Sequence, residues 1–425
     1  MSAGLRTGYK QTEVGVIPED WEASGLGHFW SVTDCKHVTA QFVPDGFPLA
    51  SIREVQSRFV DLKNAKQTTA NFYNLLIEGG RKPRPGDMIL SRNATVGEVA
   101  QVADWHPPFA MGQDVCLLRK KSESHSTEFL QAIFRSPVIL SQLANLMVGS
   151  TFKRANVQQI RNFSVPMPPP SEQRAIAAAL SDVDALLGGL DRLIAKKQGL
   201  KVAAMQQLLT GQTRLPGFSG EWEVKRLGEL GLIYGGLTGK TKADFGDGAA
   251  RYITFMNVMS NVVIDCEIFD RVNVSTAETQ NRAKKGDLFF NGSSETPEEV
   301  AMCAVLLEDV QDVYLNSFCF GFRFREDVAA NGVFFAYYLR SKEGRELMKA
   351  LAQGSTRYNL SKVALLNSSL RLPEHFEQTA IATILSDMDT ELAALQARRS
   401  KTQALKQAMM QALLTGQIRL VTPRT

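Results

Sequence analysis

Histidine, cysteine and glycine-rich segments are the parts of this sequence that could support catalysis or metal binding. The five histidines and five cysteines are scattered, without the spacing of zinc ligands or of a disulfide framework. Residues 234–241, YGGLTGKT, approach the phosphate-binding pattern GxxxxGK[ST], but Tyr234 stands where its first glycine is required. No nucleophile with a partner base can be identified. We therefore expect a noncatalytic chain that holds no metal or cofactor of its own.

A second segment has to be tested against this expectation. Residues 106–109, HPPF, resemble the (N/D/S)PP(Y/F) motif of DNA amino-methyltransferases, whose first side chain helps to hold the target amino group. Histidine lacks the carboxamide or carboxylate acceptor that this role needs. No glycine-rich strand-to-helix loop suited to S-adenosylmethionine accompanies the segment. A proline turn is the better interpretation.

An internal repeat organises the elements that would carry any functional group. The motif LLTGQTRL at residues 208–215 is repeated as LLTGQIRL at 413–420. The similarity extends towards the amino terminus as far as Glu172 and Glu377, at a constant offset of 205 residues. About 25 of these 44 positions are identical. Weaker echoes pair RPGDMIL at residues 84–90 with KKGDLFF at 284–290. The chain is therefore two copies of one plan.

The matching segments predict two long helices. Apolar residues recur at alternating steps of four and three from Ile176 to Ile194, and again from Ile381 to Leu395. Prolines precede each segment, and Gly211 and Gly416 stand where a helix would end. Packing against the globular regions is one way to bury the apolar stripes, but we favour antiparallel packing of the two helices on each other.

The regions before the two helices predict domains of mixed strands and helices. Strands are expected at residues 252–259, 286–292 and 318–324, and helical segments at 128–148 and 333–353. The predicted fold class is α+β, with two mixed α/β domains, two long antiparallel helices and an internal pseudo-twofold repeat. The expected segments are residues 1–170, 171–214, 215–375 and 376–425.

Composition adds limits on location and partners. The net charge is +4, which would not by itself indicate a nucleic-acid partner. The longest apolar stretch, residues 300–307, is too short to cross a bilayer, and the amino-terminal segment lacks an apolar signal core. We expect a cytoplasmic chain without a membrane partner.

Three features together resemble the DNA-specificity subunit of a Type I restriction-modification enzyme. They are YKQTEVGVIPEDWE at residues 9–22, the paired GST…P…EQ…I…LSx(V/M)D segments, and the paired LLTGQxRL endings. The resemblance implies two target-recognition domains, each reading half of a bipartite, asymmetric double-stranded DNA site, with the long helices as spacers. It further implies two methyltransferase subunits and, in some members, two restriction-translocase subunits. These partners would supply the S-adenosylmethionine, ATP and Mg²⁺ chemistry.

DNA-contacting residues are expected on the loops of both domains, because lysine and arginine neutralise phosphates and Arg, Asn or Gln read bases. In the first domain the candidates are Arg81, Lys82, Arg84, Arg92, Asn93, Ser150, Thr151, Lys153 and Arg154. Arg92, Asn93 and Arg154 are the favoured base readers. In the second domain they are Lys240, Lys242, Asn291, Ser293, Ser294 and Arg357, and no arginine corresponds to Arg92. Arg119 is interpreted as a surface residue.

Apolar side chains near the helix ends are the candidates for binding the methyltransferase, because exposed apolar patches mark interfaces. They are Met205, Leu208 and Leu209 and their counterparts Met410, Leu413 and Leu414. The alternative to a DNA-specificity subunit is a helical scaffold or interaction protein that uses the same helices without reading a sequence.

Overall fold

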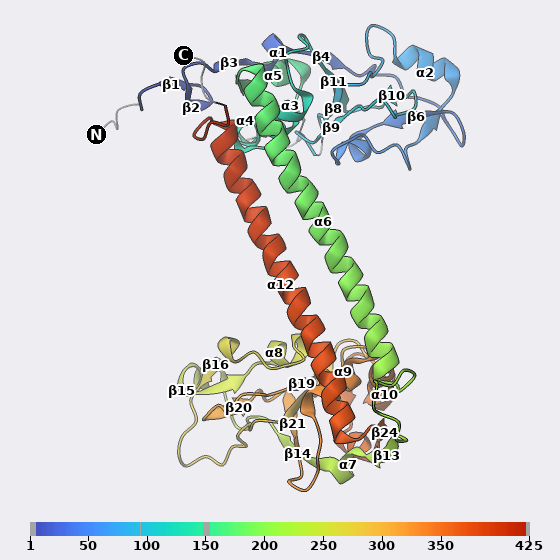
Figure 1. Cartoon of the computed structure of the whole chain (residues 1–425), viewed down its shortest axis with the longest axis vertical. Helices are drawn as coiled ribbons and strands as arrows, with labels where there is room; N and C mark the ends of the chain where they lie inside the picture. Colours follow the sequence, from blue (N-terminus) through green and yellow to red (C-terminus); the bar gives the residue numbers. More distant parts are fainter. Residues whose placement is uncertain (1–5, 94, 148–153, 422–425) are drawn as a thin grey trace. The chain divides into compact units, whose positions relative to one another are not determined.

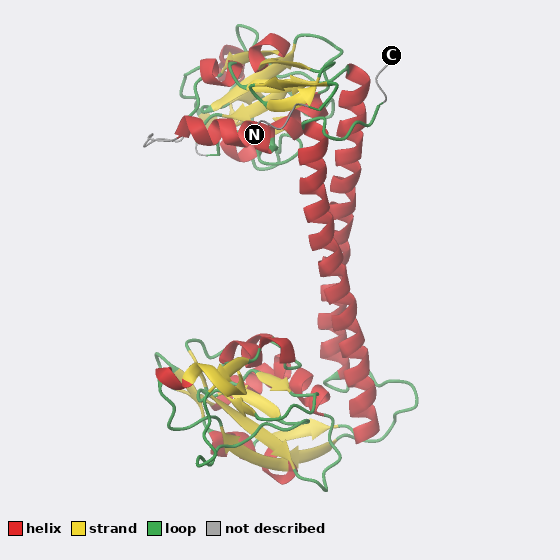
Figure 2. Ribbon diagram, turned by 90° about the vertical axis from the view of Figure 1, so that its left-hand side faces the viewer, coloured by secondary structure: helices red, strands yellow, loops and turns green. Residues whose placement is uncertain are grey.

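The computed structural model describes residues 6–93, 95–147 and 154–421 (Figure 1). Contacts divide the chain into two compact units. Unit 1 comprises Met1–Asp191 and Arg398–Thr425, and unit 2 comprises Arg192–Ala397. Strands and helices are mixed within each unit (Figure 2), which confirms the α+β class.

Unit 1 is built on a four-stranded antiparallel sheet of order β4-β11-β8-β9. A second sheet has the order β10-β6-β7-β5, and β12 pairs with β3. The strands are β1 Tyr9–Thr12, β2 Gly15–Pro18, β3 Glu22–Gly25, β4 Trp30–Asp34, β5 Phe42–Val43, β6 Phe47–Ala50, β7 Gln67–Thr68, β8 Met88–Ser91, β9 Val99–Gln101, β10 Ala110–Met111, β11 Val115–Lys120 and β12 Ser164–Met167. The shorter helices are α1 Leu26–Phe29, η1 Ile52–Val55, α2 Ala70–Leu76, α3 Thr127–Phe134, α4 Pro137–Met147 and α5 Val157–Arg161.

Unit 2 repeats the central sheet as β14-β21-β17-β19 and the flanking pair as β13-β24. Two three-stranded sheets, β16-β15-β20 and β18-β23-β22, complete it. The strands are β13 Glu223–Arg226, β14 Gly231–Gly235, β15 Phe245–Ile253, β16 Asp270–Val272, β17 Leu288–Asn291, β18 Ser293–Ser294, β19 Cys303–Val305, β20 Val313–Leu315, β21 Cys319–Phe324, β22 Ala352–Gln353, β23 Tyr358–Leu360 and β24 Ser369–Leu372. The shorter helices are α7 Leu227–Leu230, η2 Lys242–Asp244, α8 Phe255–Ser260, η3 Cys266–Ile268, α9 Gly332–Arg340, α10 Lys342–Leu351 and α11 Lys362–Asn367.

The two long helices are α6 Pro170–Leu208 and α12 His375–Leu414. Each begins one residue before the predicted segment, and each ends before a glycine with positive φ, Gly211 at 72° and Gly416 at 69°. In unit 1, Asp184 and Asp191 of α6 pair with Lys406 and Arg399 of α12, respectively. Residue numbers rise on one helix as they fall on the other, so the helices run antiparallel here.

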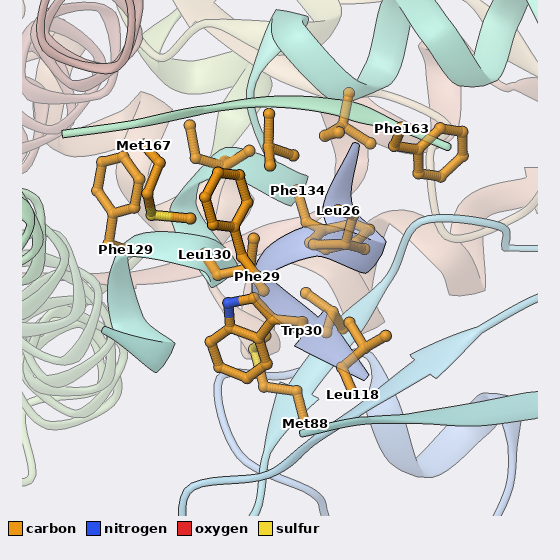
Figure 3. Packing of buried hydrophobic residues seen from close by; sticks show 14 of the residues in the cluster. Leu26, Phe29, Trp30, Met88, Leu118, Phe129, Leu130, Phe134, Phe163 and Met167 are labelled. Atoms are coloured by element: carbon orange, nitrogen blue, oxygen red, sulfur yellow. The ribbon is translucent and has the colours of Figure 1, made fainter. Parts of the chain in front are cut away.

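The predicted apolar stripe is buried in both units. Ile176 and Leu180 of α6 join the main core of unit 1, which also contains Trp30 of β4 and Phe129, Leu130 and Phe134 of α3 (Figure 3). Ile381 and Leu385 of α12 join the equivalent core of unit 2, and Ile194 of α6 is also buried. Burial of these side chains, rather than helix propensity, therefore holds the long helices on the domains.

One strand prediction was wrong in part. Residues 252–259 were expected to form a strand, but β15 ends at Ile253 and α8 follows. Thr254 accepts a hydrogen bond from the backbone N–H of Asn257 and so caps the helix. The capping residue, which lies inside the apolar run, ends the strand. Within the part of the chain that the structure describes, no helix is both long enough and apolar enough to cross a membrane.

Candidate nucleic-acid interface

The repeated EQ segment at the start of each long helix anchors that helix to its domain. The Gln173 amide donates to the carbonyl oxygen of Pro168 at 2.8 Å and accepts from the backbone N–H of Ser126 at 2.8 Å. Gln378 makes the same two contacts one repeat later, at 2.9 and 3.0 Å. One bond connects the first turn of the long helix to the residue that caps α3 or α9, and the other connects it to the segment that leads into the long helix. The glutamine is repeated because both units need this connection.

The glutamate of the same segment forms a buried clamp with the arginine of LLTGQxRL. Arg419 makes two parallel bonds to Glu172, both 2.7 Å, and Arg214 makes two to Glu377, both 2.6 Å. Both carboxylates are about 1% exposed. In unit 1, Trp21 also donates its indole N–H to Glu172 at 3.0 Å. Bidentate contacts to a buried carboxylate fix the orientation of the two groups as well as pairing their charges. The segment after each long helix is thereby bound to the first turn of the other long helix.

A third repeated contact lies in the central sheets. Asp87, in the loop before β8, receives two bonds from Arg119 of β11 at 2.9 and 2.7 Å. Asp287 and Arg323 form the same pair at 2.8 and 2.6 Å. Arg119, interpreted as a surface residue, is therefore structural. The echo between RPGDMIL and KKGDLFF was the signal for this pair, since both copies keep the aspartate.

The prediction that leucines at the helix ends bind a partner was wrong. Leu413 and Leu414 belong to the core of unit 1, and Leu208 and Leu209 belong to the core of unit 2. Leu209 and Leu414 are fully buried. The stretch after each glycine folds back on its own domain, so these side chains pack internally. Met410 and Met205 are partly buried against the same cores.

Arg92 was expected to read a base, and the structure contradicts that expectation. Its side chain is about 3% exposed, and its guanidinium lies 2.6 Å from the Asp34 carboxylate. The same guanidinium nitrogen also faces the Cys35 sulfur at 3.9 Å. A buried guanidinium loses its hydration, and the ion pair with Asp34 compensates for that loss. The side chain can therefore point into the domain. It is a structural residue of unit 1.

Three candidates of unit 2 are also internal, namely Lys240, Asn291 and Ser293. Lys240 is about 5% exposed and donates to Glu278 and to the carbonyl oxygen of Asn273. The Lys240 hydrogen bond, together with further hydrogen bonds, lowers the pKa of Glu278 to about 2. Asn291 is fully buried and accepts from the Met302 N–H at 2.6 Å while its amide donates to backbone carbonyls. These residues stabilise loops and are not available to DNA.

The third of these candidates is Ser293, which is 7% exposed and whose hydroxyl accepts a hydrogen bond from Arg357 at 3.2 Å. Ser294 is half-buried and contacts Glu299. Arg81 is half-buried and donates to the carbonyl oxygen of Asp34 at 2.9 Å. These three side chains therefore make stabilising contacts within their own domains.

The remaining candidates lie at the surface. Lys82, Arg84, Lys242 and Arg357 are exposed, and so is Arg154, which lies 3.7 Å from the carboxylate of Asp114. Asn93 is half-buried and forms a backbone bridge with Arg154. Ser150, Thr151 and Lys153 lie outside the described residues. The structure thus leaves two sets of surface cations, one on each unit, as candidate DNA contacts.

One group in the described residues has the composition of a metal site. Asp34, Cys35 and His37 each offer a ligand atom, and these atoms lie within 4.8 Å of one another. Asp34 is already paired with Arg92, however, and burial raises the pKa of the Cys35 thiol, which opposes the thiolate that a metal needs. The arrangement fits a buried ion pair better than a metal.

Comparisons with known proteins agree with this framework. The family model of the Type I restriction modification DNA specificity domain matches residues 54–195 and 219–404. A putative type I restriction enzyme MjaX specificity subunit from Methanocaldococcus jannaschii is 25% identical over 97% of both chains.

Solved structures show a similar fold. The alignment with the HsdS subunit from Thermoanaerobacter tengcongensis spans 95% of this chain and 98% of the HsdS chain, with a TM-score of 0.53 and 20% identity. A chain from a structural study of assembly of the type I R-M system covers 95% and 99%, with a TM-score of 0.59 and 19% identity. The chain therefore belongs to the family of Type I restriction-modification DNA-specificity subunits, the noncatalytic DNA-recognition components of these enzymes.

Proposed function

We propose that each unit reads one half of a bipartite, asymmetric DNA site and that the chain brings two methyltransferase subunits to that DNA. The observation that carries this proposal is the duplicated framework. Both units use the same glutamine anchor, arginine-glutamate clamp and aspartate-arginine pair. Two equal frameworks with different loops suit two different half-sites.

The exposed cations provide the groups for backbone contacts. Lys82 and Arg84 on unit 1, and Lys242 on unit 2, can neutralise phosphates and set the position of each unit on the duplex. Bond-making chemistry belongs to the partners in this proposal. S-adenosylmethionine would be bound by the methyltransferase, and ATP and Mg²⁺ by restriction-translocase subunits where these are present.

The repeat also supports two copies of one partner. Leu405 on unit 1 and Leu200 on unit 2 occupy equivalent positions of the two long helices, and they are 55% and 48% exposed. Each unit therefore presents a leucine on the same helix surface. Because exposed apolar side chains at repeated positions suit a repeated interface, we assign methyltransferase docking to these surfaces in place of the buried leucines.

Exchange of a domain tests DNA reading. Residues 216–370 are replaced by the corresponding segment of a family member with a different target, and methylated sites are mapped across a host genome together with the methyltransferase. One half of the methylated motif should change and the other should remain. Changes in both halves would contradict independent reading. A gel-shift with the unmodified complex separates this proposal from the scaffold alternative, which predicts no sequence preference.

Single charges on the helices test docking. Leu200→Asp and Leu405→Asp should each reduce the complex from two methyltransferase subunits to one, and the double variant should bind none, as measured by native mass spectrometry. Val363→Asp is the matched control, since Val363 is 70% exposed and belongs to α11, which is not one of the long helices. Two bound subunits in the double variant would refute the assigned surface.

A further inference from the structure

Each unit contains an equivalent junction at which three of its own backbone segments meet. In unit 1 the backbone N–H of Arg92 donates to the carbonyl oxygen of Asp114 at 2.8 Å, and Ala155 donates to the carbonyl oxygen of Arg92 at 2.9 Å. In unit 2, Gly292 donates to Phe318 at 2.8 Å and Leu360 donates to Gly292 at 3.0 Å. The junction therefore has the same backbone hydrogen bonds in both units.

Strand register fixes which residues correspond. Ser91 pairs with Val115 in unit 1 and Asn291 with Cys319 in unit 2, so Asp114 corresponds to Phe318. The bridge between Asn93 and Arg154 corresponds to the pairing of Ser293 with Asn359. The backbone is the same, whereas the side chains differ at every one of these positions.

The junction of unit 1 exposes a charged pair. The side chain of Arg154 is 49% exposed and that of Asp114 is 31% exposed, with 3.7 Å between them. Asp114 has φ of 65°, a left-handed conformation that is uncommon for a residue with a side chain and that occurs often at functional sites. An arginine supported by a carboxylate can make two bonds to the major-groove edge of guanine, and aspartate itself can accept from cytosine.

The junction of unit 2 exposes an aromatic ring instead. Phe318 is 59% exposed at the turn before β21, and the Arg357 guanidinium lies over its ring, 5.8 Å from the centroid. The Arg357 Nε also donates to the Ser293 hydroxyl, which orients the guanidinium. An exposed phenylalanine can contact the methyl group of thymine, and the arginine beside it can contact guanine.

We propose that this junction is a base-reading position in each half-site, with Asp114 and Arg154 as the readers in unit 1 and Phe318 and Arg357 as the readers in unit 2. The inference rests on the proposed function, since it needs both units to read DNA. One framework with two sets of side chains gives different base preferences without a change of fold. Asp114 and Phe318 are thereby specificity-determining residues.

The test maps methylated sites made by the full chain with its methyltransferase in a host that lacks other DNA methylation. Phe318→Ala should make one base of one half-site degenerate, lowering a preference of about tenfold or more to none. Asp114→Ala should do the same in the other half-site only. Phe376→Ala is the matched control, because Phe376 is also an exposed phenylalanine of unit 2, 75% exposed, and lies outside the junction.

The outcomes separate this inference from the proposed function. If the unmodified chain gives no bipartite motif, the proposed function fails. If it gives one, and Phe318→Ala and Asp114→Ala leave every base preference unchanged or only reduce the overall extent of methylation, the junction does not read bases. Arg357→Lys provides a second readout in unit 2, since it keeps the charge, removes two-pronged contact with guanine and should relax the same half-site.

Discussion

The two units differ in the residues that fill the interior next to this junction. Unit 1 buries Arg92 against Asp34, at the end of the pairing between β4 and β11. In unit 2 the register of β14 and β21 places Gly235 at the position of Asp34, and Gly292 stands at the position of Arg92. Both positions of the ion pair are therefore glycine in unit 2, so the pair is complete in one unit and wholly absent from the other. A lone buried charge would be more costly than either solution.

Glycine in unit 2 also permits a closer backbone approach. A side chain at Gly236, which follows β14, would lie 2.1 Å from the carbonyl oxygen of Asn316. Cys35 occupies the corresponding place in unit 1 and is buried beside Arg92. The two units thus fill the same region with side chains in one case and with backbone in the other, while the surrounding hydrogen bonds stay the same. Different outer surfaces can therefore be carried on one framework.

The largest effect is expected from breaking the arginine-glutamate clamps. Arg214→Ala leaves the buried Glu377 carboxylate unpaired and should cost about 3–5 kcal/mol. Arg419→Ala should cost less, because Glu172 keeps the hydrogen bond from Trp21 and the Asp20 carboxylate that also loses Arg419 is 40% exposed. In unit 2 the Trp222 indole nitrogen is buried without a hydrogen-bond partner in the described part of the chain.

Hydrogen exchange measured by mass spectrometry reports the two units separately and checks this difference. Adding Glu377→Gln to Arg214→Ala removes the buried charge and should recover part of the lost protection. Equal losses in the two units would mean that the tryptophan bond contributes nothing to the clamp.

The ion pair of unit 1 gives the next largest effect. Asp34→Gly alone leaves the Arg92 guanidinium buried without its carboxylate and should cost about 3 kcal/mol or more. Combining it with Arg92→Gly installs the two residues of unit 2. The loss should then be smaller than the sum of the single losses by about 0.5–3 kcal/mol. Urea unfolding of all four proteins completes the cycle, and additive losses would show that the two side chains act independently.

The repeat and the helices could be predicted from the sequence because they depend on local pattern. Apolar spacing and flanking prolines located both long helices to within a few residues of their observed ends. The role of Arg92 could not be predicted in this way, since its partner Asp34 lies in a different strand. Glycine at both corresponding positions of the second copy was a usable signal, because a paired loss indicates a contact.

The burial of Leu209 and Leu414 was missed for a related reason. Periodicity places a leucine on a helix face but does not show which part of the chain covers that face. Here the covering residues include Trp222 in unit 2 and Trp21 in unit 1. The assignments of Lys240 and Asn291 failed because lysine and asparagine in loops are usually exposed, and only the tertiary structure supplies the carbonyl and carboxylate partners that hold them inside.

The smallest difference between the units concerns a repeated ion pair of the long helices. Lys406 pairs with Asp184 in unit 1, and Lys201 pairs with Asp389 in unit 2. Lys201 also lies over the ring of Tyr337, 5.3 Å from its centroid, where the repeat places the smaller Ala132 in unit 1. The Tyr337 hydroxyl donates to Asp389 at 2.6 Å, and burial, with this hydrogen bond, raises its pKa, so the phenol remains a donor at neutral pH.

Lys406→Ala should therefore cost about 0.2–1 kcal/mol, as a partly exposed ion pair does. Lys201→Ala should cost about 0.5 kcal/mol more, because it also removes the contact between the ammonium group and the ring. In a Tyr337→Ala background the two losses should become equal, since the ring is then missing from both units. Screening by 1 M salt should weaken the ion-pair part of both losses. Equal losses in the unmodified protein, measured by urea unfolding, would show that Tyr337 adds nothing to the pair and that the two units are energetically the same at this position.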